Sequence, residues 1–84
     1  HPVSCKLKSG YVVLKKNQEI GEHTTNKREE LITILSGRAT VIVEKESKKI
    51  SADHVVYIPS EKKHNIKNEE TKTLRYIYTV AFLD

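Results

Sequence analysis

The stretch GEHTTNKREELITILSG, residues 21–37, places polar side chains at strand spacing ahead of an apolar run that ends at a glycine. His23 and Thr25 lie two residues apart, so on an extended strand both point to the same face. Glu30 opens the apolar run and shares its face with the isoleucines that follow. A histidine and a carboxylate on strand faces predict one wall of a metal site in an all-β fold.

A second stretch, HVVYIPSEKKHNIKN at residues 54–68, supplies the opposite wall. An apolar run leads into Pro59, a short polar loop follows, and His64 begins the next strand. Ile66 and Asn68 lie on the same face of that strand as His64. We therefore expect the two histidines and the carboxylate of the two stretches to converge.

The remaining apolar runs are short and are separated by turn residues, and none shows helical periodicity. In the strongest run, Glu30, Ile32 and Ile34 share one face, whereas Leu31 and Leu35 lie on the other. Seven or eight short strands in tandem predict a sandwich or a barrel. The expected strands cover residues 11–16, 20–25, 30–35, 38–45, 49–51, 54–58, 64–68 and 74–83.

Composition limits the classes of function. Eighty-four residues form one small domain, and no apolar run approaches the roughly 20 residues that span a bilayer. The net charge is +4, but lysines and glutamates are interleaved along the chain, so we expect no nucleic-acid and no membrane partner. Cys5 is the only cysteine and cannot form an intramolecular disulfide, which favours a reducing, cytoplasmic location.

The two polar stretches resemble the two motifs of a small single-domain cupin. The first cupin motif has a His-x-His pair, a glutamate and a glycine, and here His23, Glu30 and Gly37 stand at that spacing, with Thr25 in place of the second histidine. In the second motif, a proline, a histidine and an asparagine match the family. Those three residues are Pro59, His64 and Asn68, while Asp53 and Glu61 stand where the family usually has glycines.

The resemblance implies a double-stranded β-helix, or jelly-roll barrel, in one cupin domain over residues 1–84. We expect residues 1–8 to be leader or vector-derived and residues 10–83 to form the barrel. The resemblance places a divalent transition metal, Fe, Mn, Ni or Zn, on His23, Glu30 and His64. An empty polar barrel is the alternative, because Thr25 replaces one expected ligand.

Four further residues are candidates for the pocket around the metal: Thr25, Tyr76, Tyr78 and Asn68. Thr25 either bonds a metal-bound water or simply widens the pocket. The two tyrosines share a face with the apolar residues of the last strand, where packing is the default role. For Asn68, we expect fixing of the strand or loop backbone rather than contact with the substrate. Lys62 and Lys63 either attract an anion at the barrel mouth or are solvated loop residues.

Two functions fit these residues. The first is a metal-dependent enzyme, oxygenase-like or isomerase/epimerase-like, that acts on a small and preferentially anionic molecule. The second is a non-catalytic ligand-binding or sensory barrel without metal. For either function we expect a homodimer, because Leu31, Leu35 and the run Tyr11–Leu14 leave apolar surface that so small a barrel cannot cover.

Overall fold

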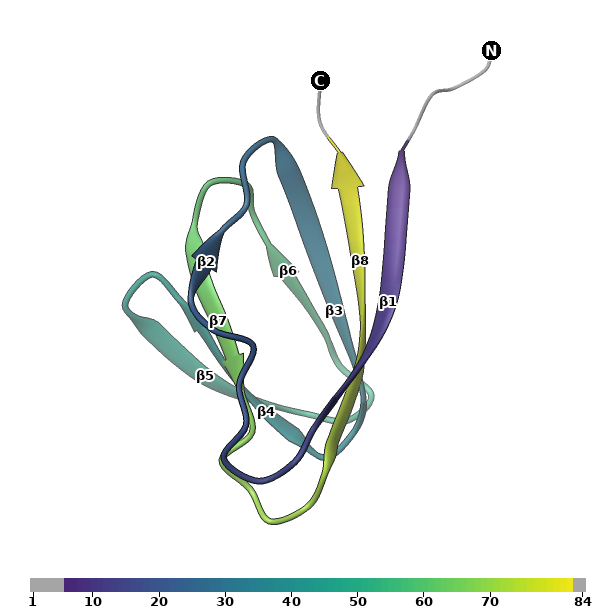
Figure 1. Ribbon diagram of the computed structural model, residues 1–84, viewed down its shortest axis with the longest axis vertical. Helices are drawn as coiled ribbons and strands as arrows, with labels where there is room; N and C mark the ends of the chain where they lie inside the picture. The colour runs from purple at the N-terminus through teal and green to yellow at the C-terminus, as the bar shows by residue number, and fades with distance from the viewer. Residues whose placement is uncertain (1–5, 83–84) are drawn as a thin grey trace.

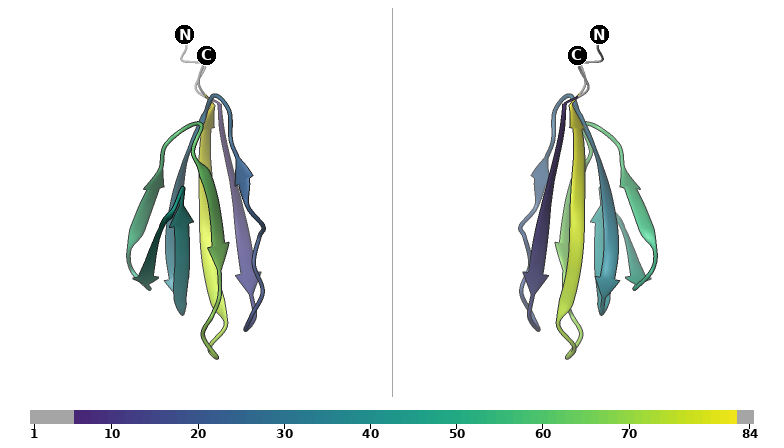
Figure 2. Two further views of the ribbon diagram at one scale, coloured as in Figure 1. Left: turned by 90° about the vertical axis from the view of Figure 1, so that its left-hand side faces the viewer. Right: turned by 90° about the vertical axis from the view of Figure 1, so that its right-hand side faces the viewer.

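The computed structural model describes residues 6–82, which form two four-stranded antiparallel sheets that face each other (Figure 1). The strands are β1 Leu7–Leu14, β2 His23–Thr24, β3 Arg28–Ser36, β4 Arg38–Val43, β5 Glu46–Ser51, β6 Val55–Ile58, β7 Lys63–Lys67 and β8 Leu74–Phe82. The strand orders are β1-β8-β3-β6 in one sheet and β2-β7-β4-β5 in the other. Figure 2 shows the two layers from either side, with β7 in front in one view and β8 in the other. The predicted all-β fold is confirmed. Between residues 6 and 82, no helix is long and apolar enough to cross a membrane.

The core lies between the sheets and follows the alternation of the strands. In β3, Glu30, Ile32 and Ile34 are buried, whereas Leu31 and Leu35 on the opposite face are 43% and 45% exposed. The same alternation in the other strands completes one apolar cluster. Its buried members are Leu14, Ile32, Ile34, Ala39, Val41, Ile58, Ile66, Leu74 and Tyr76.

Gly37 makes the hairpin between β3 and β4. Its φ of +86° lies in the left-handed region, and a Cβ at this position would lie 2.7 Å from the carbonyl oxygen of Thr73. Glycine is therefore required both by the backbone conformation and by the packing of the hairpin against the segment that leads into β8. Just before this turn, between Ile34 and Ser36, the register of β3 with β8 shifts at an irregularity.

The first strand begins earlier than predicted. β1 starts at Leu7 rather than Tyr11 and pairs with β8 along its whole length, from Leu7 opposite Ala81 to Leu14 opposite Leu74. Leu7 and Lys8, which we expected to precede the barrel, therefore pair within this sheet. Pairing with a long central strand overrides the weak strand propensity of LKSG. Residues 1–5 of the expected leader and residue 83 of the expected barrel lie outside the described residues.

The hairpin between β4 and β5 also differs from the prediction, because β5 begins at Glu46 rather than Lys49. Glu44 makes the turn with a φ of +56°. Its backbone NH donates to the carbonyl oxygen of Lys63 at 2.7 Å, and its carboxylate accepts a bond from the Lys63 NH at 2.7 Å. These contacts with β7 set the turn position, which local turn propensity could not reveal.

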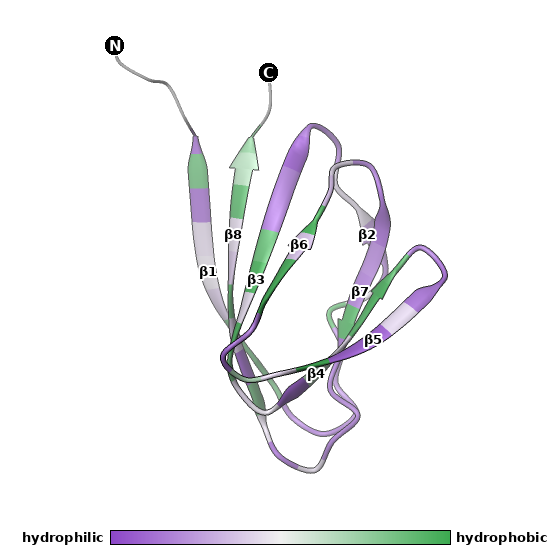
Figure 3. Cartoon of the chain, turned by 180° about the vertical axis from the view of Figure 1, so that it is seen from behind, coloured by the Kyte–Doolittle hydropathy of each residue, from purple (hydrophilic) through white to green (hydrophobic). Residues whose placement is uncertain are grey.

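The outer faces of the two sheets differ in polarity. Figure 3 shows the difference between two of their strands, since β6 is largely hydrophobic and β5 largely hydrophilic. On the β2-β7-β4-β5 sheet, Lys49 pairs with Glu69 and Glu70, and Lys67 pairs with Glu19. The β1-β8-β3-β6 sheet instead exposes large apolar side chains, which we call the apolar outer face. Its residues are Leu7, Tyr11, Val13, Leu31, Leu35, Val55 and Tyr57.

Candidate metal centre

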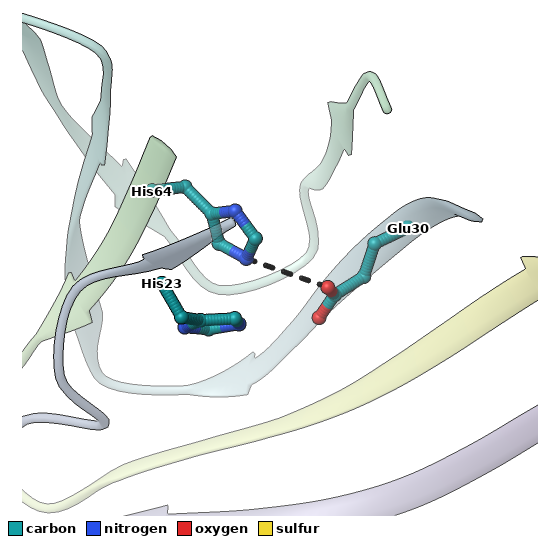
Figure 4. Close-up of side chains that lie close together, drawn as sticks. All are labelled: His23, Glu30 and His64. Carbon is teal, nitrogen blue, oxygen red and sulfur yellow. Dashed lines mark ion pairs between the residues drawn. The ribbon is translucent and has the colours of Figure 1, made fainter. Parts of the chain in front are cut away.

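Three potential metal ligands converge between the sheets. His23 in β2 and His64 in β7 are directly paired across the β2-β7-β4-β5 sheet, and Glu30 reaches towards them from β3 in the other sheet (Figure 4). One potential ligand atom from each of the three side chains lies within 4.8 Å of the other two. Glu30 and His64 are buried, while His23 is exposed. The site therefore has a closed side and an open side.

Backbone carbonyls orient both imidazoles. The Nδ1 atom of His23 lies 3.1 Å from the Gly21 carbonyl oxygen, and that of His64 lies 3.2 Å from the Lys62 carbonyl oxygen. Because a carbonyl oxygen only accepts hydrogen bonds, Nδ1 is the protonated nitrogen in each ring and donates to it. The lone pair of each neutral ring then lies on Nε2. This is the arrangement that protein metal sites use to hold imidazole ligands.

The buried polar atoms of the site fit a cation. The Nε2 atom of His64 is buried and has no hydrogen-bond partner, although it lies 3.5 Å from Glu30 Oε1. Thr25 Oγ1, at the position of the missing histidine, is buried without a partner as well. Leaving such atoms unpaired costs about 1–3 kcal/mol each. A divalent ion bound to Nε2 and the Glu30 carboxylate would satisfy the histidine and neutralise the buried charge.

The electrostatics of the site centre on Glu30. Burial lowers the pKa of His64, but the Glu30 carboxylate and the Lys62 carbonyl outweigh this effect and raise the pKa above its usual value. Burial, and then the Glu30 charge, also raise the pKa of Tyr76 far above that of a free phenol. Tyr76 therefore stays protonated at neutral pH and is a hydrogen-bond donor in the pocket.

A pocket of about 290 Å³ opens beside His23 and Glu30, two of the three potential ligands. It is lined by Lys8, Val12, Ile20, His23, Thr25, Arg28, Glu30, Tyr76, Tyr78, Val80 and Phe82. Thr25, Tyr76 and Tyr78, which the sequence placed near the metal, are among these residues. Tyr78 lies over Gly10 of β1, where any larger side chain would collide with its ring. Gly10 thus lets the phenol lie flat against the pocket wall.

Asn68 does not line this pocket, and its contacts agree with the backbone-fixing role that the sequence favoured over contact with a ligand. It is fully buried, and its amide nitrogen donates to the carbonyl oxygens of Leu14 at 2.9 Å and Lys72 at 3.0 Å. Its side-chain oxygen accepts a bond from the Glu70 NH at 3.0 Å. All these contacts are with backbone, so Asn68 ties the end of β1 to the turn before β8.

Of the two alternatives for Lys62 and Lys63, the structure agrees with solvated loop residues, and other cations line the pocket. Lys62 and Lys63 are exposed and do not line it, whereas Lys8 and Arg28 do. Arg28 lies two residues before Glu30 on the same face of β3, so strand alternation carried a signal that could have identified it. Lys8 was hidden because the start of β1 was placed too late.

The family comparison agrees with this geometry. The profile of the Cupin_2 family, described as a cupin domain, matches residues 10–80. The chain belongs to the cupin family. A search of curated protein sequences found no significant match.

Solved structures of other cupins share the fold. The cupin domain of Cnp3 from Schizosaccharomyces pombe is 24% identical with a TM-score of 0.86, covering 90% of this chain and 56% of that one. A predicted oxalate decarboxylase from Thermotoga maritima is 21% identical with a TM-score of 0.86, covering 89% and 65%. A cupin 2 conserved barrel domain protein from Salinispora arenicola CNS-205 is 22% identical with a TM-score of 0.79, covering 90% and 62%. This cupin thus spans less than two thirds of each of these chains, and at such identities the likeness shows the double-stranded β-helix alone.

The second cupin motif departs from the family at two turns. Asp53 and Glu61 stand where cupins usually have glycine, and both adopt left-handed backbone conformations, with φ of 68° and 64°. The turns have kept the conformation for which glycine is suited. The Glu61 NH donates to the Thr25 carbonyl oxygen at 2.8 Å, which ties the loop before His64 to the segment that carries His23.

Proposed function

We propose that this cupin binds a divalent transition metal through His23, Glu30 and His64 and acts on a small molecule in the adjoining pocket. The main support is the buried Nε2 atom of His64, which faces the Glu30 carboxylate without a hydrogen-bond partner. Two imidazoles and one carboxylate suit Fe, Mn, Ni or Zn and leave coordination positions open. When bound, such an ion supplies Lewis-acid polarisation or an oxygen-binding centre, for isomerase/epimerase-like or oxygenase-like chemistry.

The protein's own groups define what enters the pocket. Glu30 is the only carboxylate among the described pocket residues, so a divalent ion leaves the pocket positively charged. This charge favours a small anionic ligand. Tyr76 stays protonated and can donate a hydrogen bond from the pocket wall, beside the apolar side chains of Val12 and Val80.

The test of this function is a reaction that depends on the metal. The protein is first reloaded with Fe(II) under anaerobic conditions, or with Mn(II), Ni(II) or Zn(II). It is then incubated with small oxo and hydroxy acids in the presence of oxygen. Conversion is followed by proton NMR and by oxygen uptake. We expect conversion of at least one acid by the parent and none after chelation or in the Glu30→Gln variant. Conversion that persists in Glu30→Gln would sink the proposal.

A non-catalytic ligand-binding or sensory barrel is the second candidate. Thr25 favours it, because one histidine of the family motif is missing and the threonine hydroxyl cannot replace the imidazole. In that case the His64–Glu30 pair is the remnant of a former site. Ligand affinity would then be the same with and without metal, and it would survive Glu30→Gln.

We also propose that the protein is a homodimer that buries the apolar outer face. Leu7, Leu31 and Tyr57 on this face are 63%, 43% and 53% exposed, and a second copy of the chain could cover them. We predict that sedimentation equilibrium at micromolar concentration gives twice the 9.6 kDa chain mass and that Leu31→Glu shifts the protein to monomer. A parent mass of one chain would contradict this. The cytoplasmic location and the absence of nucleic-acid and membrane partners stay predictions from the sequence.

A further inference from the structure

We propose that Arg28, assisted by Lys8, is the carboxylate-binding group of the pocket, so that the ligand is a small carboxylic acid held at one end by Arg28. This inference rests on the proposed function for the other end of the ligand, which would face His23, Glu30 and His64. Binding of the carboxylate itself does not require the metal, and the two ideas can be tested separately.

The position of Arg28 follows from strand alternation. Arg28 and Glu30 lie on the same face of β3, about 7 Å apart along the strand, and both line the pocket. Lys8 lies opposite Val80 on β8, and Val80 is in turn paired with Glu30 on the far side. The two cations thus approach the pocket from two strands, one on each side of β8.

The guanidinium of Arg28 is held in place without a carboxylate partner among residues 6–82. Its Cζ atom lies 5.8 Å from the centroid of the Phe82 ring, on the neighbouring strand, and Arg28 is only partly exposed. The ion pairs of the described chain use Lys49, Lys67 and His64 as cations, but neither Arg28 nor Lys8. A cation–π contact orients the planar fork while leaving its N–H donors available.

This combination selects a carboxylate. An arginine fork donates two parallel hydrogen bonds to a planar carboxylate, whereas a lone lysine offers a point charge. A pocket of about 290 Å³ is at the small end of ligand pockets, which suits a molecule of a few carbons. A second oxygen on that molecule, as in an oxo or hydroxy acid, would reach the side of the pocket where His23 and Glu30 lie.

The experiment is an NMR titration of ¹⁵N-labelled protein at constant ionic strength, with pyruvate as the probe and neutral pyruvamide as its uncharged match. It is run on metal-free protein and on protein loaded with Zn(II). Three variants are compared: Arg28→Gln, Lys8→Gln and, as the matched control, Arg38→Gln. Arg38 is exposed, lies on β4 in the other sheet and does not line this pocket.

We expect pyruvate to shift the amide signals around residues 8 and 28 in both forms of the protein. Arg28→Gln should weaken pyruvate binding about tenfold and Lys8→Gln about threefold, while Arg38→Gln leaves it unchanged within a factor of about two. Pyruvamide should bind about tenfold more weakly than pyruvate to the parent. The amide spectrum of each variant verifies that it is folded.

Equal pyruvate affinity in Arg28→Gln and Arg38→Gln, no binding by the parent, or equal affinity for pyruvamide would overturn the assignment. Inorganic phosphate that binds as tightly as pyruvate would overturn the choice of a carboxylate. The zinc uptake of the parent separates this inference from the proposed function. A parent that takes up no zinc yet binds pyruvate through Arg28 contradicts the metal site and supports the carboxylate site.

Discussion

His64 and Asn68 are both buried polar residues, with exposures of 1% and 0%. His64 lies in β7, and Asn68 directly follows that strand. The side chain of Asn68 makes three hydrogen bonds, all to backbone atoms of Leu14, Lys72 and Glu70. His64 uses Nδ1 for a backbone carbonyl but leaves Nε2 without a hydrogen-bond partner opposite Glu30. Equal burial therefore conceals different roles, since satisfied polar groups hold the fold whereas an unsatisfied one is available for a ligand.

Replacing Asn68 should cause the largest loss of stability. Asn68→Ala removes three hydrogen bonds and leaves buried backbone groups unpaired, so we expect the free energy of unfolding to fall by about 3 kcal/mol. For a domain of this size the melting temperature should drop by roughly 15 °C. Circular dichroism melts measure this, with Ser47→Ala on exposed β5 as the control. A drop similar to that of the control would show that Asn68 is not a scaffold residue.

Removing the charge of Glu30 should have the opposite pattern, with loss of metal and little loss of stability. Glu30→Gln keeps the size of the side chain, so the metal-free protein should melt at the parent temperature or slightly higher, because a buried carboxylate is removed. Zinc affinity, measured by calorimetry, should fall at least about 100-fold, equivalent to about 2.7 kcal/mol. Glu29→Gln changes the neighbouring residue, which bonds Tyr57 on the apolar outer face, and should leave zinc affinity unchanged. Equal losses in the two variants would contradict the site.

Restoring the family's second histidine should strengthen the site. Thr25 is buried in the pocket wall with an unpaired hydroxyl, so Thr25→His introduces a third imidazole where cupins have a ligand. We expect zinc binding to tighten about tenfold, or about 1.4 kcal/mol. Thr25→Val, which removes only the hydroxyl, separates this effect from a change of packing and should bind zinc like the parent. Weaker binding in Thr25→His would show that position 25 does not face the metal.

The pH dependence should differ in sign between the two forms of the protein. The raised pKa of His64 stabilises the metal-free fold below the ordinary histidine pKa, and this contribution is lost as the pH rises through the raised value. Metal binding needs the neutral imidazole, so zinc affinity should rise over the same range. Thermal melts from pH 5.5 to 8 with and without zinc test this. Parallel curves for the two forms would argue against His64 as a ligand.

Local patterns in the sequence predicted the fold and the three candidate ligands. Alternation alone put Glu30 on the inward face of β3 with Ile32 and Ile34, and the two cupin motifs brought His23 and His64 together. The inward position of Glu30 depends on residues close in sequence, for which strand geometry leaves few alternatives, whereas the pairing of His23 with His64 came from the family resemblance.

Features that depend on distant contacts were missed. The start of β1 is set by pairing with β8, so Lys8 could not be recognised as a pocket residue. The sequence indicated a backbone-fixing role for Asn68 but not its partners, because one of them, Leu14, is 54 positions away. At Asp53 and Glu61 the backbone is left-handed although neither residue is glycine. The residue types therefore gave no indication of these turn conformations.

Metal content is the most direct measurement of the central claim. The parent, Glu30→Gln and His64→Ala are purified without chelator, reloaded in parallel with Fe(II), Mn(II), Ni(II) and Zn(II), desalted and analysed by inductively coupled plasma mass spectrometry. We predict about one ion per chain in the parent, with at least one of these metals, and less than about a tenth of that in either variant. A parent that remains empty after reloading, or a His64→Ala variant that retains as much metal as the parent, would contradict the account.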